Sequence, residues 1–431
     1  MQSKLLKNEL KDFWEIDRSH PYCSTEWWTV EAFFETEDRQ QWSIRSYLSQ
    51  WRDKPKKVGS LINITLFNQK NGKCFSYHSR NDTERLSSNK QEFKIEYDES
   101  FITGNYPNYV MEFIDKNNNI KLQINFHVKS SPHWITKDAT QGWIPLGLGS
   151  LRFGFIPKGN IFGTLRIGSS TLALKGKGYF EHVWGNFSFS NPFLNYFKSK
   201  KIIPLYCKLF YWWIDSHSLK IPKRISFNTM NNPLGYDWFW AVLDNGWSLV
   251  YGNLLFWITQ GPAIGTLILS KNEKTSIEFC NIHFKYTKMM HSKNFDFYYP
   301  SELELTASKG IENIHIKLQM NAESREYISR FIHNNYWSAL VSCEAPGEVK
   351  GYYSNGKKKI QISGICKIEP QRQISILGDN SLELNFTLPP KGIGVDTDIA
   401  SHLLRKRITA KIHLIPRPIL KFQIKKHNDD G

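Results

Sequence analysis

The sequence lacks the short motifs that identify several large classes of enzyme. Its 431 residues contain no G-x-S-x-G, no Walker phosphate loop and no G-x-G-x-x-G, which argues against a serine hydrolase, a nucleotide hydrolase and a dinucleotide-dependent enzyme. The six cysteines are far apart and include no C-x-x-C, so neither a redox motif nor a zinc site is indicated. The histidines are scattered without a metal-ligand spacing. We therefore expect no metal and no cofactor.

Long apolar runs are also missing. No segment reaches eighteen uninterrupted apolar residues, whereas a membrane-spanning helix needs about 20. The charged N-terminal stretch has no apolar region of the kind found in secretory signals, which predicts a cytoplasmic location.

Acidic residues are too few to balance the basic ones, and the formal net charge is +16. Such a charge favours an anionic partner. No zinc-finger spacing or RNA-binding signature accompanies it, so we expect no nucleic acid and keep an anionic membrane surface as the candidate partner.

Period-two alternation of apolar residues dominates what is present. The stretch 120–128 places Ile120, Leu122, Ile124, Phe126 and Val128 on one face, and 313–320 has the same pattern. Such alternation predicts half-buried antiparallel strands. Many more short strand candidates follow, separated by turn-like sequences such as LDNGW and SNGKK. The predicted fold class is all-β, with two lipocalin-like antiparallel barrel or sandwich domains. At this length we place them at 18–262 and 263–425.

One segment, an insert at about 190–232, breaks the strand pattern. Asn191 and Pro192 suit a helix start, and the following residues mix aromatic rings with lysines around a single acidic residue, Asp215. The rings could pack on the parent domain and leave the lysines in water. Alternatively, 190–224 contacts an anionic membrane peripherally, with rings at the headgroup boundary and lysines against the lipid charges.

A second segment, 321–335, also departs from alternation. Tyr327, Ile328, Phe331 and Ile332 recur at helical spacing. This spacing predicts one short amphipathic helix that covers or plugs a barrel.

Three clusters combine aromatic rings with carboxylates: STEWWTVEAFF at 24–34, GKGYFEHVWGNF at 176–187 and GYDWFWAVLDNGWSLVYG at 235–252. They raise the question of whether the polar residues only pack against rings or form an acid/base group inside an aromatic pocket. In the third cluster, alternation puts Trp238 and Trp240 on one strand face and Asp237 with Phe239 on the other.

These clusters, in this order, resemble the hydroxyneurosporene synthase family, the carotenoid hydratases, and its two-domain lipocalin-like relatives. The family has an early Glu-Trp-Trp, then Gly-x-Gly-Tyr/Trp-x-Asp-His-x-Trp-Gly, then Trp-x-Trp before a Leu-x-x-Gly turn. The matching residues here are Glu26, Trp27, Trp28, Gly176, Gly178, Tyr179, His182, Trp184, Gly185, Trp238, Trp240, Leu243 and Gly246. Weaker similarity, at Tyr336-Trp337 among other positions, extends the resemblance over roughly residues 20 to 395.

The resemblance implies a cofactor-independent enzyme that acts on a long apolar polyene or terpenoid. Hydration of its C=C bond needs a strong acid, and a desolvated carboxyl can stay protonated near neutral pH. Our first candidate for this acid is Asp237 and the second is Glu181, with His182 or Tyr179 orienting water. Candidate substrate-binding residues are Glu26, Trp27, Trp28, Trp184, Tyr236, Trp238, Trp240 and Trp337.

This chain departs from the family pattern at several positions. Glu181 replaces an aspartate, Lys367 stands where a tyrosine is expected, and Ser338 stands where an acid is usual. The reaction could accordingly be hydration or a cyclisation or isomerisation. A lipocalin-like carrier of hydrophobic ligands, without catalysis, is the alternative from another class, because such a pocket would also serve storage.

Overall fold

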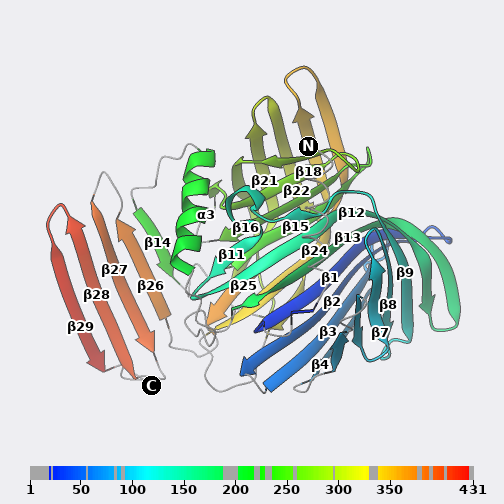
Figure 1. Cartoon of the computed structure of the whole chain (residues 1–431), viewed down its shortest axis with the longest axis horizontal. Helices are drawn as coiled ribbons and strands as arrows, with labels where there is room; N and C mark the ends of the chain where they lie inside the picture. Colours follow the sequence, from blue (N-terminus) through cyan, green and yellow to red (C-terminus); the bar gives the residue numbers. More distant parts are fainter. Residues whose placement is uncertain are drawn as a thin grey trace.

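The protein is described by a computed structural model. It describes residues 19–20, 23–54, 57–81, 85–88, 93–187, 202–217, 224–228, 235–255, 260–294, 297–329, 338–375, 381–387, 392–401 and 405–426. Two curled antiparallel sheets form the body, and a third, smaller sheet lies at one end (Figure 1).

The first sheet contains thirteen strands within the described residues, in the order β4-β3-β2-β1-β13-β12-β9-β8-β7-β6-β5, with β10 and β11 paired to β12. The strands are β1 (Thr25–Thr36), β2 (Gln41–Lys54), β3 (Lys57–Asn68), β4 (Cys74–Asn81), β5 (Leu86–Ser88), β6 (Lys94–Tyr97), β7 (Ser100–Asn105), β8 (Asn108–Asp115), β9 (Ile120–Val128), β10 (His133–Trp134), β11 (Trp143–Leu146), β12 (Gly149–Ile167) and β13 (Ser170–Asn186). A short helix, α2 (Lys137–Thr140), follows β10. β1 and β13 are neighbours in the middle of this sheet, which brings two of the three motifs side by side.

The second sheet has eleven strands within the same described ranges, and β15 carries the third motif through its middle. Its strands are β15 (Gly235–Leu243), β16 (Ser248–Leu255), β17 (Gln260–Pro262), β18 (Gly265–Ser270), β19 (Ser276–Phe279), β20 (Asn281–His291), β21 (Tyr298–Lys309), β22 (Glu312–Met320), β23 (Arg325–Ser329), β24 (Ser338–Ser354) and β25 (Lys359–Ser375). By strand pairing the change of sheet falls between β13 and β15, earlier than residue 262. The boundary at residue 262 stays a prediction about domains.

Between the two sheets in sequence lies α3 (Ile202–His217), which together with residues 224–228 makes up the described part of the predicted insert. The helix start expected at Asn191 and Pro192 lies outside the described residues. The third sheet follows the order β14-β26-β27-β28-β29. Its strands are β14 (Arg224–Asn228), β26 (Ser381–Thr387), β27 (Ile393–Ser401), β28 (Lys406–Ile415) and β29 (Ile419–Lys426).

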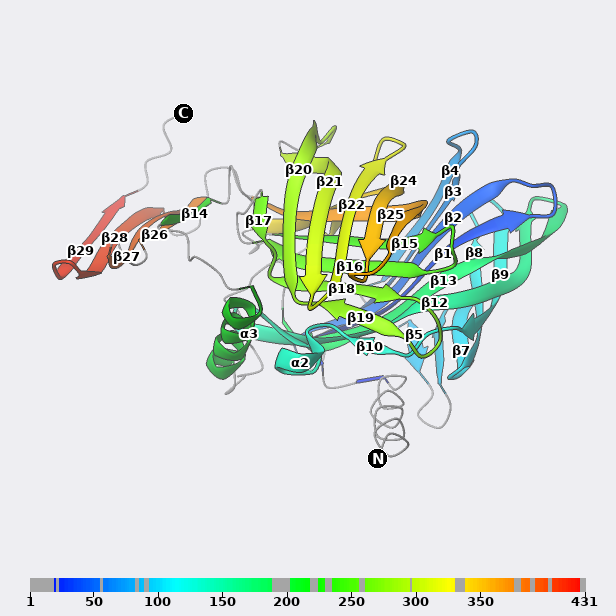
Figure 2. The same cartoon turned by 90° about the horizontal axis from the view of Figure 1, so that it is seen from above.

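The alternation found in the sequence matches the observed burial. Every second residue of β9, from Ile120 to Val128, is buried, and in β22 Ile314, Ile316, Leu318 and Met320 are buried. These residues belong to the separate cores on the inner faces of the two curled sheets. A third core joins residues of both sheets, and in Figure 2 the two sheets meet along β1, β13, β15 and β16. We call this region the seam.

The helix predicted for 321–335 is wrong in its described part. Residues Arg325–Ser329 form β23, which pairs with β24 through the register Arg325↔Glu344 to Ser329↔Leu340. A Tyr-Ile pair suits a strand as well as a helix, and the neighbouring strand supplies the backbone hydrogen bonds that an isolated short helix would have to form alone. Residues 330–335 lie outside the described residues.

Candidate active site

The first two motifs face each other across one strand pair. β1 and β13 are antiparallel with Trp28 opposite His182 and Thr29 opposite Glu181. Successive residues of a strand point to opposite faces. Each motif is therefore divided: one set of side chains enters the inner core of the first sheet and the other set enters the seam.

The glycines of the second motif allow the strands to approach closely. A Cβ on Gly176 would lie 2.1 Å from the carbonyl oxygen of Phe33, and one on Gly185 would lie 2.2 Å from that of Ser150. Neither distance is tolerable for a real side chain. Both positions therefore require glycine, which agrees with its use where backbones come close together.

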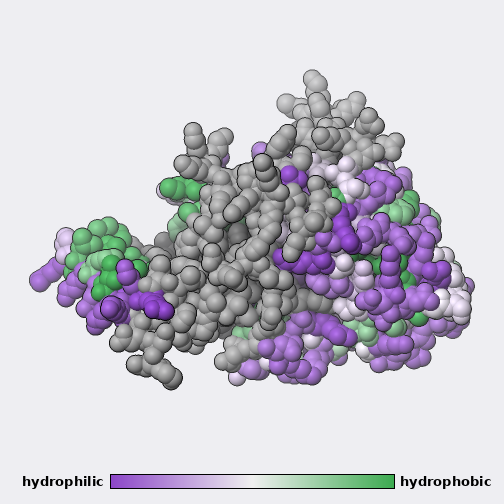
Figure 3. Space-filling view, turned by 90° about the horizontal axis from the view of Figure 1, so that it is seen from below, coloured by the Kyte–Doolittle hydropathy of each residue, from purple (hydrophilic) through white to green (hydrophobic). Residues whose placement is uncertain are grey.

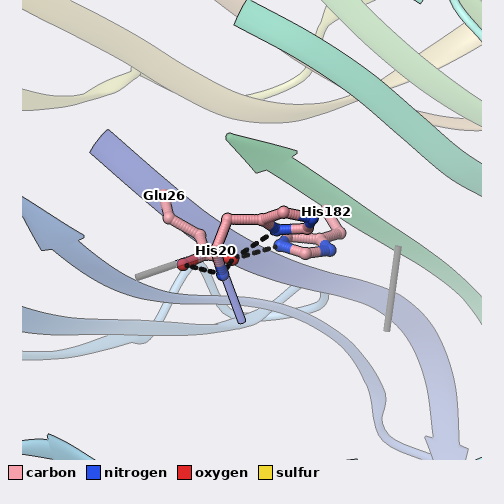
Figure 4. Close-up of side chains that lie close together, drawn as sticks. All are labelled: His20, Glu26 and His182. Carbon is pink, nitrogen blue, oxygen red and sulfur yellow. Dashed lines mark hydrogen bonds and ion pairs between the residues drawn. The ribbon is translucent and has the colours of Figure 1, made fainter. Parts of the chain in front are cut away.

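On the inner face, Glu26 gathers two histidines (Figure 4). His182 Nε2 and His20 Nδ1 each lie 3.0 Å from Glu26 Oε1, and the His20 backbone N–H donates to both carboxylate oxygens at 2.8 and 3.0 Å. Gln50 donates to Oε2. Burial alone would raise the pKa of Glu26, but the hydrogen bonds from His182 and His20 lower it to about 2. Glu26 is thus a buried, ionised anchor.

Two tryptophans enclose His182. The ring of Trp28 stacks on His182 with centroids 4.7 Å apart, and Trp184 lies at the same distance on a tilted plane. Trp184 also stacks on His20 at 4.1 Å. The two imidazoles and the two indole rings therefore form one aromatic group around the Glu26 carboxylate.

His20, Glu26 and His182 are also the ligand types of a metal site, because their donor atoms lie within 4.8 Å of one another. However, Glu26 already accepts hydrogen bonds at both oxygens, so the group is complete without an ion. The expectation of no metal stays a prediction. His20 was not among the predicted residues, and no periodicity marks it, since it precedes the first strand.

Replacing Glu26 with glutamine should lower the free energy of unfolding by about 3 kcal/mol, because the buried hydrogen-bond partners of this carboxylate, His20 and His182, lose their ionised acceptor. Urea unfolding at pH 7 measures the change. The same carboxylate stabilises the wild type above the ordinary pKa of 4.5 and loses that contribution as the pH falls through about 2. Glu35→Gln is the control, since this carboxylate of β1 accepts only an exposed hydrogen bond from Gln41. Equal losses of unfolding free energy in Glu26→Gln and Glu35→Gln would contradict the role of Glu26 as a buried, ionised anchor.

On the seam side, Glu181 accepts hydrogen bonds from Tyr179 Oη at 2.6 Å and from Trp27 Nε1 at 3.0 Å. Tyr179 is fully buried, and its ring centroid lies 5.9 Å from those of Trp238 and Trp240 on the second sheet. Burial raises the pKa of Glu181, opposed by the hydrogen bonds from Tyr179 and Trp27. The seam thus holds a carboxyl of weakened acidity inside an aromatic shell, contributed by both sheets.

Next to this group lies a buried ion network, also across the seam. Arg45 Nη2 is 2.8 Å from Glu369 Oε1, its Nη1 is 3.3 Å from Glu344 Oε2, and its Nε is 3.7 Å from Glu31 Oε1. Lys367 pairs with Glu344 and lies 3.8 Å from Glu31. Three carboxyls therefore share two cations in a region excluded from water.

The shortage of cations is reflected in the titration of the acids. Burial raises the pKa of Glu31 to about 8 despite the attraction of Lys367, and burial also raises the pKa of Glu369. At Glu344 burial is outweighed by Lys367 and Arg45, which lower the pKa. Glu31 therefore keeps its proton at neutral pH.

Because folded Glu31 keeps its proton, the free energy of unfolding should fall as the pH rises from about 4.5 to about 8. Unfolded Glu31 releases its proton near 4.5, whereas the folded one keeps it up to about 8. The native state binds more protons between these values, so the free energy of unfolding should fall as the pH rises, by an amount on the order of 4 kcal/mol. Glu31→Gln should flatten this dependence in urea titrations between pH 5 and pH 9, whereas Glu35→Gln should leave it unchanged. A wild-type stability that rises over this range would refute the assignment.

Most of the predicted site residues fall into two groups. His182, Glu26, Trp28 and Trp184 share the inner face of the first sheet; Tyr179, Glu181, Trp27, Tyr236, Trp238 and Trp240 meet at the seam. Trp337 lies outside the described residues.

Asp237 belongs to neither group. As the sequence predicted, it lies on the opposite face of β15 from Trp238 and Trp240, where its Oδ1 is 2.9 Å from Arg372 Nη1 and its Oδ2 accepts a hydrogen bond from Tyr286. The structure does not bring Asp237 together with the tryptophans that were expected to assist it.

A solvent-open cavity of about 480 Å³ is lined by none of these residues. Its lining carries four lysines and one acid: Lys129, Lys158, Asn160, Lys177, Asn272, Glu273 and Lys274. Such a polar, basic lining does not suit a long apolar ligand.

No protein-family model matches the chain, and no curated protein matches its sequence. Several solved structures are similar to it in fold, and two of them are as follows. A protein described as AttH from Nitrosomonas europaea is 13% identical, with 83% of this chain and 94% of that chain covered at a TM-score of 0.56. Kievitone hydratase from Nectria haematococca is 13% identical, with 82% and 90% covered at a TM-score of 0.52. The predicted all-β, two-domain lipocalin-like fold is confirmed. At such identities the likeness concerns the fold alone.

Proposed function

We propose that this chain is a cofactor-independent enzyme that acts on a C=C bond of a long apolar polyene or terpenoid, with Glu181 as the proton donor. The single observation that carries the proposal is the seam geometry: a carboxyl with raised pKa, hydrogen-bonded by Tyr179 and Trp27 and facing the rings of the second sheet. Perturbed carboxyls in aromatic surroundings are typical of general acids.

The surroundings of Glu181 suit both the protonated acid before proton transfer and the carboxylate that remains after it. Burial holds the proton on Glu181 before reaction. When the proton moves to an alkene carbon, the O–H bond breaks, a C–H bond forms and a carbocation results. The new carboxylate is then stabilised by the hydrogen bonds from Tyr179 and Trp27, while the faces of Trp238 and Trp240 can each stabilise the cation by roughly 0.5 to 2 kcal/mol.

The cation has two fates. If water adds, its surplus proton returns to the Glu181 carboxylate and an alcohol results. If an internal double bond adds, a ring and a new carbocation form, and a carbon next to the new cation loses a proton to the Glu181 carboxylate. If instead a carbon next to the first cation loses a proton to Glu181, an isomer results; the formula is unchanged in both cases. In both routes the acid is regenerated, and no external oxidant or cofactor is required.

Two further observations support this reaction class. The three sequence clusters resemble those of carotenoid hydratases, and one structural neighbour is named a hydratase. Asp237 is less suited as the acid than Glu181, because it is engaged with Arg372 on the face of β15 away from the seam rings. His182 and Glu26 lie on the other face of the first sheet from Glu181, so we assign them to positioning of the strand pair.

The test compares lipid extracts of cells that carry either the intact protein or Glu181→Gln, grown in water labelled with ¹⁸O and analysed by mass spectrometry. A labelled alcohol that is missing in the variant would establish hydration, and a new isomer of unchanged mass would establish cyclisation or isomerisation. If both strains hold the same compounds and the purified protein merely carries one of them, the enzyme proposal fails in favour of the carrier.

A further inference from the structure

The third sheet has one apolar face. The register pairs Ile408 with Ile424, Ala410 with Phe422 and Ile412 with Leu420, and alternation places all of these on one side. β27 adds residues of the same kind through Val395↔Ile412 and Ile399↔Ile408. The described residues of this face, which we call the apolar face, are Val395, Thr397, Ile399, Ile408, Ala410, Ile412, Leu420, Phe422 and Ile424.

Much of this face is open to water. Ile412 is 39% exposed, Leu420 79%, Phe422 65% and Ile424 51%. Figure 3 shows hydrophobic residues gathered over this sheet at the left end of the molecule, next to hydrophilic ones. Contiguous exposed apolar residues of this kind mark an interaction surface in a stable protein.

The opposite face of the same sheet is polar and already paired. Arg407 forms an ion pair with Asp398, and both Lys411 and His413 lie within reach of Asp396. The sheet is therefore amphipathic: one side is suited to water, and the other carries exposed apolar side chains among the described residues. An isolated sheet of this kind would lose hydrophobic stabilisation unless the apolar face is buried against something.

Basic residues border the apolar face. Lys406 and Lys426 stand opposite each other at one end of it, next to Arg405, and Arg417 occupies the turn between β28 and β29 at the other end. A second copy of the chain packed face to face would bring like charges together at these borders. A bilayer with anionic headgroups offers the opposite charge there and a hydrocarbon region for the apolar side chains.

The helix α3 has a similar exposed surface. Ile203 is 72% exposed, Tyr211 73% and Phe210 48%, while Leu209 and Trp213 are buried. Figure 3 shows hydrophobic residues over α3 in the same view as those of the third sheet. Among the described residues, no helix is long and apolar enough to cross a membrane. Exposed aromatic and aliphatic residues on a helix of 16 residues suit contact with the headgroup boundary.

We propose that the apolar face of the third sheet docks on an anionic membrane surface, with α3 as an auxiliary contact. This assignment does not depend on catalysis at the seam. It extends the membrane contact predicted for 190–224 to a second element, β27 to β29, which the sequence pattern had placed within a barrel domain.

The test is co-sedimentation of the full chain with phosphatidylcholine vesicles, with and without about one third phosphatidylserine. The wild type should bind the anionic vesicles at least tenfold more tightly, with affinity falling as salt is raised. The double variant Leu420→Ser/Phe422→Ser should weaken binding by at least tenfold. The matched control is Ile419→Ser, which changes a 37% exposed residue of the same strand on the polar face and should bind like the wild type.

Two results would overturn the proposal. One is a wild type that stays in solution with anionic vesicles. The other is a dimer in light scattering that the double variant, but not Ile419→Ser, converts to monomers; the occupant of the face would then be a second copy. Circular dichroism of each variant shows whether the strands remain folded, and because the changed residues are exposed we expect no loss.

Discussion

Replacing Arg45 with methionine lowers the free energy of unfolding by about 3 to 5 kcal/mol at neutral pH. Arg45 is contributed by the first sheet, whereas Glu344 and Glu369, two of its three carboxyl partners, are contributed by the second. Methionine keeps much of the side-chain length but removes the guanidinium. Glu344 and Glu369 would then have only Lys367 as a cation next to them in a region without water, and the uncompensated carboxylate charge would oppose the packing of one sheet on the other.

The pH dependence separates this electrostatic cause from simple loss of packing. In the variant, the carboxyls can be neutralised by protons, so much of the lost stability should return in urea titrations at about pH 5. Arg166→Met, which changes an exposed arginine of β12, is the control and should alter stability little. A loss that is the same at pH 5 and pH 8 would show that Arg45 acts through packing alone.

Replacing Glu181 with glutamine is expected to reduce turnover by at least 100-fold, the usual contribution of a general acid. Glutamine preserves the shape of the side chain and an oxygen that can accept a hydrogen bond, so the fold should persist, but it has no proton to transfer. Thermal unfolding of the variant, measured next to its activity, checks this separation. Since the proton must be present on Glu181 for reaction, wild-type activity should fall as the pH rises through the raised pKa of this group.

The control for this prediction is Glu304→Gln, a partly exposed carboxylate of the second sheet that pairs with His315. It should leave turnover unchanged. If Glu181→Gln retained wild-type turnover with a normal thermal midpoint, proton donation would have to come from another group, and Asp237 would return as the first candidate.

The sequence predicts best what depends on neighbouring residues. Alternation located β9 and β22 and placed Trp238 and Trp240 on the opposite face of β15 from Asp237. The turn-like sequence LDNGW identified the turn at Gly246, whose φ of 81° favours glycine. Each of these features follows from the two-residue period of a strand or from the local demands of a turn.

The groups of side chains that form between distant parts of the chain were harder to predict from the sequence. In the ion network at the seam, Arg45 pairs with Glu369, which is 324 positions away in the chain. No local sequence pattern predicts such a pair. A hint exists at Glu31, a carboxylate within the otherwise apolar run TVEAFF, because a charged residue inside a buried strand requires a partner. The division of the 176–187 motif between two faces likewise depends on the register with β1, which is set by contacts distant in sequence.

The central claim is that Glu181 delivers a proton to carbon, and deuterium incorporation tests it most directly. Purified protein is incubated in D₂O with the lipid extract that contains its substrate, and the product is analysed by mass spectrometry. We expect one carbon-bound deuterium per product molecule from the wild type and no product from Glu181→Gln. A product without carbon-bound deuterium, or an equal yield of deuterated product from the variant, would contradict the role of Glu181.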